Sequence, residues 1–258
     1  MKFLAREFNE FLLAIQFLTI LPTVITPDYS TEELNKSGKY FPLVGIIIGT
    51  IGFLAFQFIN IIFEFKLLAI LVSMITTILV TGAFHEDGFT DFCDGYGGGF
   101  GDKEKIISIM RDSRIGAFGT IGIFLLLSLK LILLERVETS LLFLVILLGH
   151  SLSRFNAIAF LVTDIYASTT GKSKPMANQL TFIELIFASL PILVLFYFLP
   201  KSFILTLVAI VIVHLVFRFH YFKITKGFTG DGLGAVQQVS EVMIYFTVLG
   251  VSKWKFIY

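Results

Sequence analysis

The sequence predicts an all-α integral membrane protein that forms a single polytopic membrane domain over residues 1–258. Its composition points there first, because 56% of the residues are hydrophobic and only 15% are charged, whereas soluble proteins are about one quarter charged. Long apolar segments also recur along the chain. The single cysteine, Cys93, excludes an internal disulfide and a thiolate zinc cluster. Nothing in the composition suggests nucleic-acid binding, so we expect no nucleic-acid partner.

The first apolar segment, Phe8–Val24, is interrupted by polar residues and closed by Pro22. It is marginal as a membrane span, and it lacks the small-residue cleavage site of a signal peptide. We therefore expect an interfacial or re-entrant helix at the amino terminus. A polar loop follows over Thr26–Tyr40.

Seven further apolar segments are each close to the length that crosses a bilayer. The first contains Gly45-x-x-x-Gly49, a weak signal for close contact between helices. The predicted spans are Phe41–Phe63, Leu67–Phe84, Gly116–Leu134, Ser140–Val162, Phe182–Leu199, Ser202–Phe222 and Val239–Val251.

The distribution of basic residues predicts the orientation of these spans. Twelve Lys and Arg residues fall on the side that holds Gly82–Gly119, five fall on the other side, and the remaining three lie inside spans. Cytoplasmic loops of membrane proteins carry the excess of Lys and Arg. We therefore expect Gly82–Gly119 to face the cytoplasm.

The region Gly82–Gly119 concentrates the polar chemistry, with seven of the nineteen carboxylates and nine of the twenty-one glycines. Asp87, Asp91 and Asp94 stand at i, i+4 and i+7, within about 60° of one another on a helix. Like charges stacked in this way repel one another, and a bound cation would reverse that effect. Mg²⁺ prefers carboxylate oxygens and often takes substrate phosphates as further ligands. The spacing therefore predicts a magnesium site.

The alternative interpretation of this region is a solvated polar loop between two spans. Three observations favour a functional site. The acids follow the apolar run Leu67–Phe84 without a break, which places the first acid at membrane depth or at the interface, where ionisable groups are usually functional. Glycines such as Gly97 and Gly98, which we expect in a flexible loop, let the backbone approach a ligand closely. Basic residues that include Arg111 and Arg114 follow within reach of a polyanion.

Two further stretches on the same side carry polar residues. In Gly227–Glu241, either Asp231 or Thr229 is a good N-cap for the last span. The free amides of such a helix start bind phosphate well, although a plain turn and cap is an equal alternative. Arg154 and Arg218 lie late in their spans and either reach the headgroups or point inward to an anionic substrate. For Arg154 we favour the inward orientation.

Several motifs match a known family when they are taken in chain order. The longest are His85-x-Asp87-Gly88-Phe89-x-Asp91-x-x-Asp94-Gly95 and Met110-x-Asp112-Ser113-Arg114-Ile115-Gly116-x-Phe118-Gly119. Shorter ones are Phe17-Leu18-Thr19, Phe41-Pro42-Leu43-Val44-Gly45, Ser153-Arg154 and Gly227-Phe228-Thr229-Gly230-Asp231. Together they resemble the cobalamin synthase (adenosylcobinamide-GDP ribazoletransferase) family over nearly the whole chain. The segment Ile165-Tyr166-Ala167-Ser168 departs from the family by lacking an arginine, so no role is assigned there.

The resemblance implies the last assembly step of the cobalamin nucleotide loop, in a bacterial or archaeal cytoplasmic membrane. A ribose hydroxyl of α-ribazole, or of its 5′-phosphate, would attack the cobinamide-side phosphate of adenosylcobinamide-GDP. GMP would leave, and the product would be adenosylcobalamin or its 5′-phosphate. The resemblance also implies dependence on Mg²⁺. The oligomeric state is left open, a homo-oligomer included.

Displacement at a pyrophosphate develops charge that a metal held by acids can stabilise. We assign metal binding and catalysis to Asp87, Asp91 and Asp94. Either His85 or an acid not fully engaged by the metal would take the hydroxyl proton. The residues expected to bind substrate are Gly97, Gly98, Arg111, Asp112, Arg114, Arg154, Thr229 and Asp231.

Two other functions are weighed against this one. Asp91-x-x-Asp94-Gly95 resembles the opening of the CDP-alcohol phosphotransferase motif, but the rest of that motif is absent. An ion-coupled transporter also uses intramembrane acids and broken helices. Its polar residues would lie near the midplane, however, whereas here they cluster on one side of the membrane.

Overall fold

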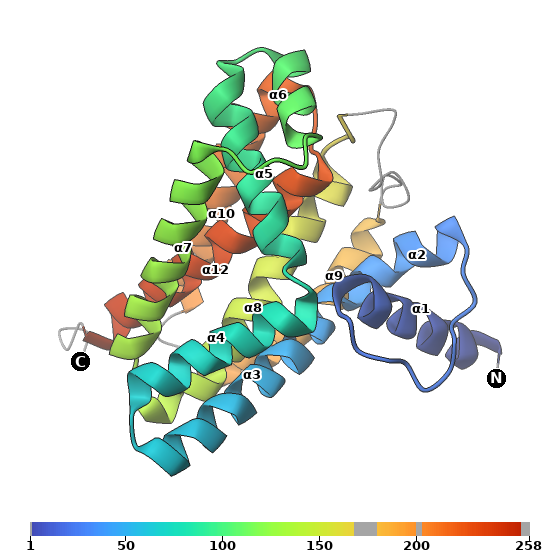
Figure 1. The fold of residues 1–258 in the computed structure, drawn as a ribbon. Coiled ribbons are helices and arrows are strands. Elements are labelled where there is room, and N and C mark those ends of the chain that lie inside the picture. Colours follow the sequence, from blue (N-terminus) through green and yellow to red (C-terminus); the bar gives the residue numbers. More distant parts are fainter. Residues whose placement is uncertain (1, 168–179, 200–202, 254–258) are drawn as a thin grey trace.

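The computed structural model describes residues 2–167, 180–199 and 203–253, and almost all of this part is helical (Figure 1). Ser168 and Ser202, which belong to segments discussed above, lie outside the described residues. The elements are α1 (Lys2–Leu18), α2 (Thr31–Ser37), η1 (Gly38–Tyr40), α3 (Phe41–Phe63), α4 (Lys66–Thr81), α5 (Phe84–Gly99), α6 (Lys103–Met110), α7 (Ala117–Arg136), α8 (Thr139–Thr163), α9 (Phe182–Phe198), α10 (Phe203–Val216), η4 (Phe217–Phe222), α11 (Lys223–Thr225) and α12 (Gly230–Lys253).

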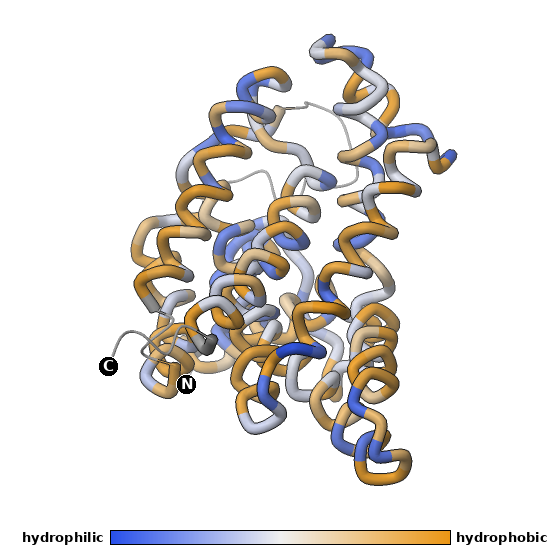
Figure 2. The backbone as a smooth tube through the Cα atoms, turned by 90° about the vertical axis from the view of Figure 1, so that its left-hand side faces the viewer, coloured by the Kyte–Doolittle hydropathy of each residue, from blue (hydrophilic) through white to orange (hydrophobic). Residues whose placement is uncertain are grey.

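The described residues confirm the expected all-α membrane protein. Each of the seven predicted apolar segments contributes a helix, and apolar residues run along most helices (Figure 2). Within the part of the chain that the structure describes, five helical segments are long and apolar enough to cross a membrane, and the bent pair α4–α5 would make a sixth. With 17 residues, α9 is shorter than these five. The five are Thr31–Phe63, Ala117–Arg136, Thr139–Thr163, Ile204–Thr225 and Gly230–Val251.

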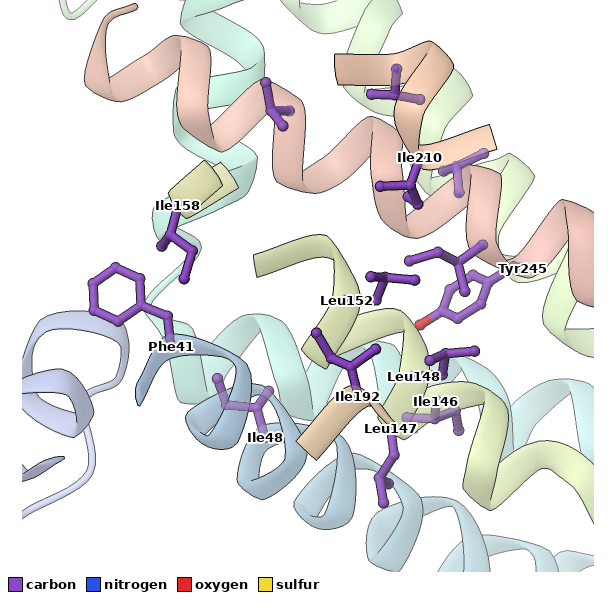
Figure 3. Close-up of a cluster of buried hydrophobic side chains, with 14 of the residues drawn as sticks. Phe41, Ile48, Ile146, Leu147, Leu148, Leu152, Ile158, Ile192, Ile210 and Tyr245 are labelled. Carbon is purple, nitrogen blue, oxygen red and sulfur yellow. The ribbon is translucent and has the colours of Figure 1, made fainter. Parts of the chain in front are cut away.

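Helix α8 forms the centre of the bundle. In its most apolar stretch 78% of the residues are buried inside the protein, compared with 28% in α7. Helix α3 packs directly against it, because a Cβ atom on Gly45 would lie 2.3 Å from the carbonyl oxygen of His150. The predicted close contact at Gly45 is therefore confirmed. Figure 3 shows the apolar core around α8, to which Ile48 of α3 and Ile192 of α9 belong together with Leu148 and its neighbours.

The amino-terminal helix α1 lies outside the main bundle, beside α2 (Figure 1). It is not among the described helices that are long and apolar enough to cross a membrane, and its interfacial or re-entrant placement stays a prediction. Buried ion pairs attach it to η1, where Lys39 Nζ lies 2.7 Å from Glu7 Oε2 and 2.6 Å from Glu10 Oε2. Tyr40 also donates a hydrogen bond to Glu7 Oε2 at 2.6 Å.

Helices α4 and α5 meet at a sharp corner with an angle of 88° between them. Gly82 and Ala83 both adopt left-handed backbone conformations, with φ of +62° and +57°, and the Ala83 N–H donates to the carbonyl oxygen of Ile78 at 2.9 Å. The expectation that the apolar run Leu67–Phe84 continues into the acids without a break is therefore wrong. The helix ends at Thr81, and the acids belong to a new helix that runs in another direction.

A polar network joins α7, α8 and α12 inside the bundle. Lys130 Nζ on α7 lies 3.1 Å from Glu241 Oε1 on α12 and donates to Gln238 Oε1 at 2.6 Å. Gln237 Nε2 donates to Glu241 Oε2 at 2.9 Å and to Ser153 Oγ on α8 at 3.0 Å. All five side chains are buried. A buried charge whose partner is removed destabilises a protein strongly, so this network ties the three helices together.

We expect Lys130→Met to lower the stability of the folded protein by about 3–5 kcal/mol, because it leaves Glu241 as a buried charge without its cation. The double variant Lys130→Met with Glu241→Gln should recover much of that loss. The measurement is thermal unfolding of the protein in detergent. Lys223→Met, at an exposed position, is the control. A Lys130→Met protein as stable as the control would contradict the role given to the network.

Candidate active site

Helix α5 carries the predicted acidic stripe. Asp87, Asp91 and Asp94 lie on one helix, as their spacing predicts. Their burial increases along it: Asp87 is exposed, Asp91 is half-buried and Asp94 is buried. His85 precedes Asp87 by two residues, about 200° around the helix, and its ring is buried in the protein. His85 and the stripe therefore face in opposite directions.

The first turn of α12 packs against α5 at Gly88. A Cβ atom on Gly88 would lie 3.1 Å from the Cα of Asp231 and 3.5 Å from the Cα of Gly234. The Gly232 N–H donates to Thr229 Oγ1 at 3.0 Å, so Thr229 caps α12. Asp231 stands within the first turn, where its carboxylate is not the capping group. The expected convergence of Asp231 with the acids of α5 is therefore present.

Asp87, Asp91 and Asp231 form a cluster of like charges, which we call the acidic cluster. The negative charges of Asp87 and Asp231 act on Asp91, and that of Asp87 acts on Asp231. Within the described part of the chain, no salt bridge reaches any of the three. Carboxylates in such proximity disfavour one another's ionised form. A divalent cation would remove that repulsion, and the oxygen donors suit Mg²⁺.

The acidic cluster is only part of a metal coordination shell. Among the described residues, no three His, Cys, Asp or Glu side chains are arranged so that they could hold a metal ion together. Mg²⁺ commonly binds through one or two carboxylates and completes its octahedron with water and substrate phosphates. The donor set therefore fits a cation that arrives with, or is completed by, a phosphate ligand.

Asp94 has a different environment from the other acids. Its Oδ2 accepts a hydrogen bond from the Gly116 N–H at 2.7 Å, and its Oδ1 accepts one from the Gly119 N–H at 2.9 Å. Both carboxylate oxygens thus bind the start of α7, which stabilises the amides left free there. In this structure Asp94 caps α7, and its assignment to the metal stays a prediction.

The glycines after the acids are helical, so the expected flexible loop is wrong. Helix α5 continues to Gly99. A Cβ on Gly97 would lie 2.4 Å from Phe118 Cγ, and one on Gly98 would lie 3.2 Å from Ile109 Cδ1. These positions lack side chains because α6 and α7 pack directly against α5. The expected contact of Gly97 and Gly98 with substrate stays a prediction.

The connection from α6 to α7 carries Arg111, Asp112 and Arg114. Asp112 Oδ1 accepts hydrogen bonds from the backbone N–H of Arg114 at 3.1 Å and from its Nε at 3.0 Å. These bonds hold the pKa of Asp112 below its usual value. Arg111 is exposed and Arg114 almost fully so. This connection ends at Gly116, which Asp94 holds, so the basic side chains are attached to the acidic helix.

Arg154 points into the bundle, as favoured from the sequence. It is 2% exposed, and its NH1 donates to the carbonyl oxygen of His150 at 2.9 Å. With His85 and Gly230, Arg154 lines a pocket whose other walls are apolar, which we call the Arg154 pocket. Arg218, by contrast, pairs with Asp164 at 3.3 Å and is partly exposed, so the two arginines differ in environment.

The buried network next to this pocket was not predicted. Glu86 on α5 accepts a hydrogen bond from Gln238 Nε2 at 2.9 Å, which connects the acidic helix to Lys130 and Glu241. The predicted last span began at Val239, whereas α12 begins at Gly230. Polar residues within a membrane helix are usually functional or paired, and that signal was present in the sequence.

Comparisons with known proteins agree over almost the whole chain. The sequence profile of the cobalamin-5-phosphate synthase family matches residues 10–249. Curated relatives named adenosylcobinamide-GDP ribazoletransferase include a Vibrio cholerae protein that is 38% identical over 93% of this chain and 92% of its own length. A Vibrio parahaemolyticus protein is 40% identical over 93% of this chain and 91% of its own length. A Leptospira biflexa protein is 36% identical over 98% of this chain and 99% of its own length.

No solved structure matches the chain. The match to the family profile nevertheless spans every motif of the site, from Phe17 near the amino terminus to Asp231 at the start of α12. The relatives cover the same region at 36–40% identity. On this evidence the chain belongs to the cobalamin-5-phosphate synthase family.

Proposed function

We propose that this protein joins α-ribazole, or its 5′-phosphate, to adenosylcobinamide-GDP and releases GMP. A ribose hydroxyl attacks the cobinamide-side phosphorus, a new P–O bond forms, and the P–O bond to GMP breaks. The product is adenosylcobalamin or its 5′-phosphate. The observation that carries the proposal is the agreement of family and relatives along nearly the whole chain. The meeting of the acidic cluster with the start of α12 supports it.

The residues for this displacement lie on α5 and at the start of α12. One or two of the carboxylates of Asp87, Asp91 and Asp231 would hold Mg²⁺, and water and substrate phosphates would complete its ligands. The ion, when bound, would neutralise charge that develops on the pyrophosphate oxygens. His85, two residues before Asp87, lines the adjoining Arg154 pocket. The hydroxyl proton passes either to His85 or to a carboxylate oxygen of the cluster that holds no metal.

The basic connection between α6 and α7 would bind the GDP portion. Arg111 and Arg114 are exposed there, and arginine binds phosphate through paired hydrogen bonds. Because Asp94 holds the end of this connection to α5, the two arginines stay close to the acidic helix. Preorganised charges of this kind stabilise a transition state better than mobile ones.

The purified full-length protein in detergent, given adenosylcobinamide-GDP, α-ribazole and Mg²⁺, should release GMP and form adenosylcobalamin in equal amounts. Asp87→Asn and Asp91→Asn should each lower GMP release by about 100-fold or more, because each removes a charge from the metal site. EDTA should abolish the wild-type rate. Glu104→Gln, an equal change of charge at an exposed position on α6, is the control. Wild-type rates in both acidic variants would exclude the proposed metal site.

Asp94→Asn should behave differently from Asp87→Asn. An amide presents one acceptor oxygen to two N–H donors, so Asp94→Asn should lower the melting temperature by several degrees. Asp87→Asn removes repulsion and should leave it unchanged or raise it when no metal is present. Melting curves recorded with and without Mg²⁺ test this, since a ligand that binds the folded state raises the melting temperature. Stabilisation of Asp87→Asn by Mg²⁺ to the wild-type extent would contradict the assignment.

We further propose that the acidic cluster faces the cytoplasm in a cell membrane. The twelve-to-five excess of basic residues supports this orientation. A reporter fused after Lys226, just before α12, should be active in the cytoplasm. One fused after Arg136, at the end of α7, should report from the opposite side. Both reporters on the same side would contradict the proposed topology.

A further inference from the structure

The Arg154 pocket lies next to the acidic cluster, because its lining includes His85 and Gly230, which stand two residues and one residue before Asp87 and Asp231. It is bounded by the ends of α1 and α8 and by the starts of α3, α5 and α12. Figure 3 shows Phe41 and Ile158, from α3 and α8, facing each other across this region. Apart from His85, five aromatic side chains line it: Phe17, Phe41, Phe84, Tyr166 and Phe228. Such walls favour a flat apolar ring over a hydrated, charged one.

The one fully charged group in the lining is Arg154, and it is incompletely satisfied. Its Nε has no hydrogen-bond partner among the described residues, although the side chain is 2% exposed. Glu241 forms its ion pair with Lys130, and its charge and that of Glu86 also act on Arg154, but neither carboxylate accepts a hydrogen bond from Nε. A buried polar group without a partner is costly, and a buried charge more so. The unsatisfied donor therefore indicates an anionic ligand in the pocket.

The start of α12 contributes a second feature that attracts anions. Gly230, its first residue, lines the same pocket as Arg154. Thr229 accepts from the Gly232 amide, while the other amides of a first turn lack partners within the helix, and the helix dipole makes this end positive. Phosphate groups bind well at such ends. The next residue, Asp231, belongs to the acidic cluster, so a ligand here lies within one residue of the proposed metal site.

We propose that the Arg154 pocket binds the acceptor nucleoside and selects its 5′-phosphorylated form. The apolar base lies among the aromatic side chains, and the 5′-phosphate contacts Arg154 and the start of α12. This inference rests on the proposed function and deepens it. The 5′-phosphate takes no part in the displacement and stays on the product, while the ribose hydroxyl, near His85, loses its proton as the new P–O bond forms.

The lining favours the acceptor over the other substrate. A guanine ring carries several hydrogen-bonding groups that aromatic and aliphatic walls leave unsatisfied, whereas the benzimidazole base of ribazole is apolar and flat. The two family names also differ on this point. One names a 5-phosphate product, and the other names the transfer of ribazole. Arg154 would explain a preference for the phosphorylated acceptor.

The test is steady-state kinetics of the full-length protein with saturating adenosylcobinamide-GDP and either α-ribazole 5′-phosphate or α-ribazole. Arg154→Gln should lower kcat/KM for the phosphorylated acceptor by about 10- to 100-fold, the value of a charged hydrogen bond. With α-ribazole the change should stay within about threefold. Phe17→Leu, which removes a ring stacked on Phe41, should raise the KM of both acceptors by about 2- to 10-fold. Arg218→Gln is the matched control.

Equal losses with both acceptors, or a raised KM for adenosylcobinamide-GDP in Arg154→Gln, would overturn the proposal. Thermal shift of the wild-type protein provides a second measurement that needs neither turnover nor a folded variant. α-Ribazole 5′-phosphate should raise the melting temperature more than α-ribazole does, and equal shifts would contradict the assignment. Stabilisation by a short-chain phosphatidic acid alone would assign the pocket to a lipid. Absence of GMP release with either acceptor would instead refute the proposed function.

Discussion

The candidate site depends on the close approach of α12 to α5 at Gly88. There the backbone of α12 lies so close to α5 that a Cβ would meet the Cα of Asp231 at 3.1 Å. This contact places the carboxylate of one helix beside the carboxylates of another, far away in sequence. It also holds the cap at Thr229 and the end of the Arg154 pocket against the same turn of α5. Without it the acids, the helix start and the pocket would be separate features.

The site is electrostatically unfavourable by itself, and the bundle supplies the stability that it lacks. The acidic cluster brings like charges together, and Arg154 has an unsatisfied Nε. Opposed to this are the buried pair of Lys130 with Glu241 and the dense contact of α3 with α8 at Gly45. Functional sites often keep such local conflicts, which the surrounding fold must over-determine. Here the conflicts all concern groups that attract ions of the opposite sign.

Local patterns in the sequence were sufficient for much of this architecture. The apolar segments became helices, and the i, i+4, i+7 spacing of the acids put them on one stripe, since both follow from periodicity within one element. The approach of Asp231 to the acids was expected as well. No local pattern specifies a contact between α5 and α12. The expectation came from chemistry, because the metal-binding and phosphate-binding groups of one active site must lie close together.

The features that could not be predicted depend on partners distant in sequence or on rare backbone conformations. Ala83 adopts a left-handed conformation that its residue type disfavours, so the corner before α5 had no clear signal. The role of Asp94 is defined by amides 22 and 25 residues further on. Gly97 was expected in a loop. Its place in a helix depends on packing against Phe118 of α7, a contact that the sequence around Gly97 does not reveal. Lys130 and Glu241 likewise meet only in the folded bundle.

The cap at Asp94 would couple cation binding at the acidic cluster to the conformation of the basic connection between α6 and α7. The same helix presents the acidic cluster at one end of its stripe and, through Asp94, holds the connection that bears Arg111 and Arg114. A cation that drew the Asp94 carboxylate towards the cluster would have to compete with the amides of Gly116 and Gly119. If a cation binds in this way, its binding and that of a nucleotide on the basic connection would be linked, and each ligand would change the affinity for the other by the same factor.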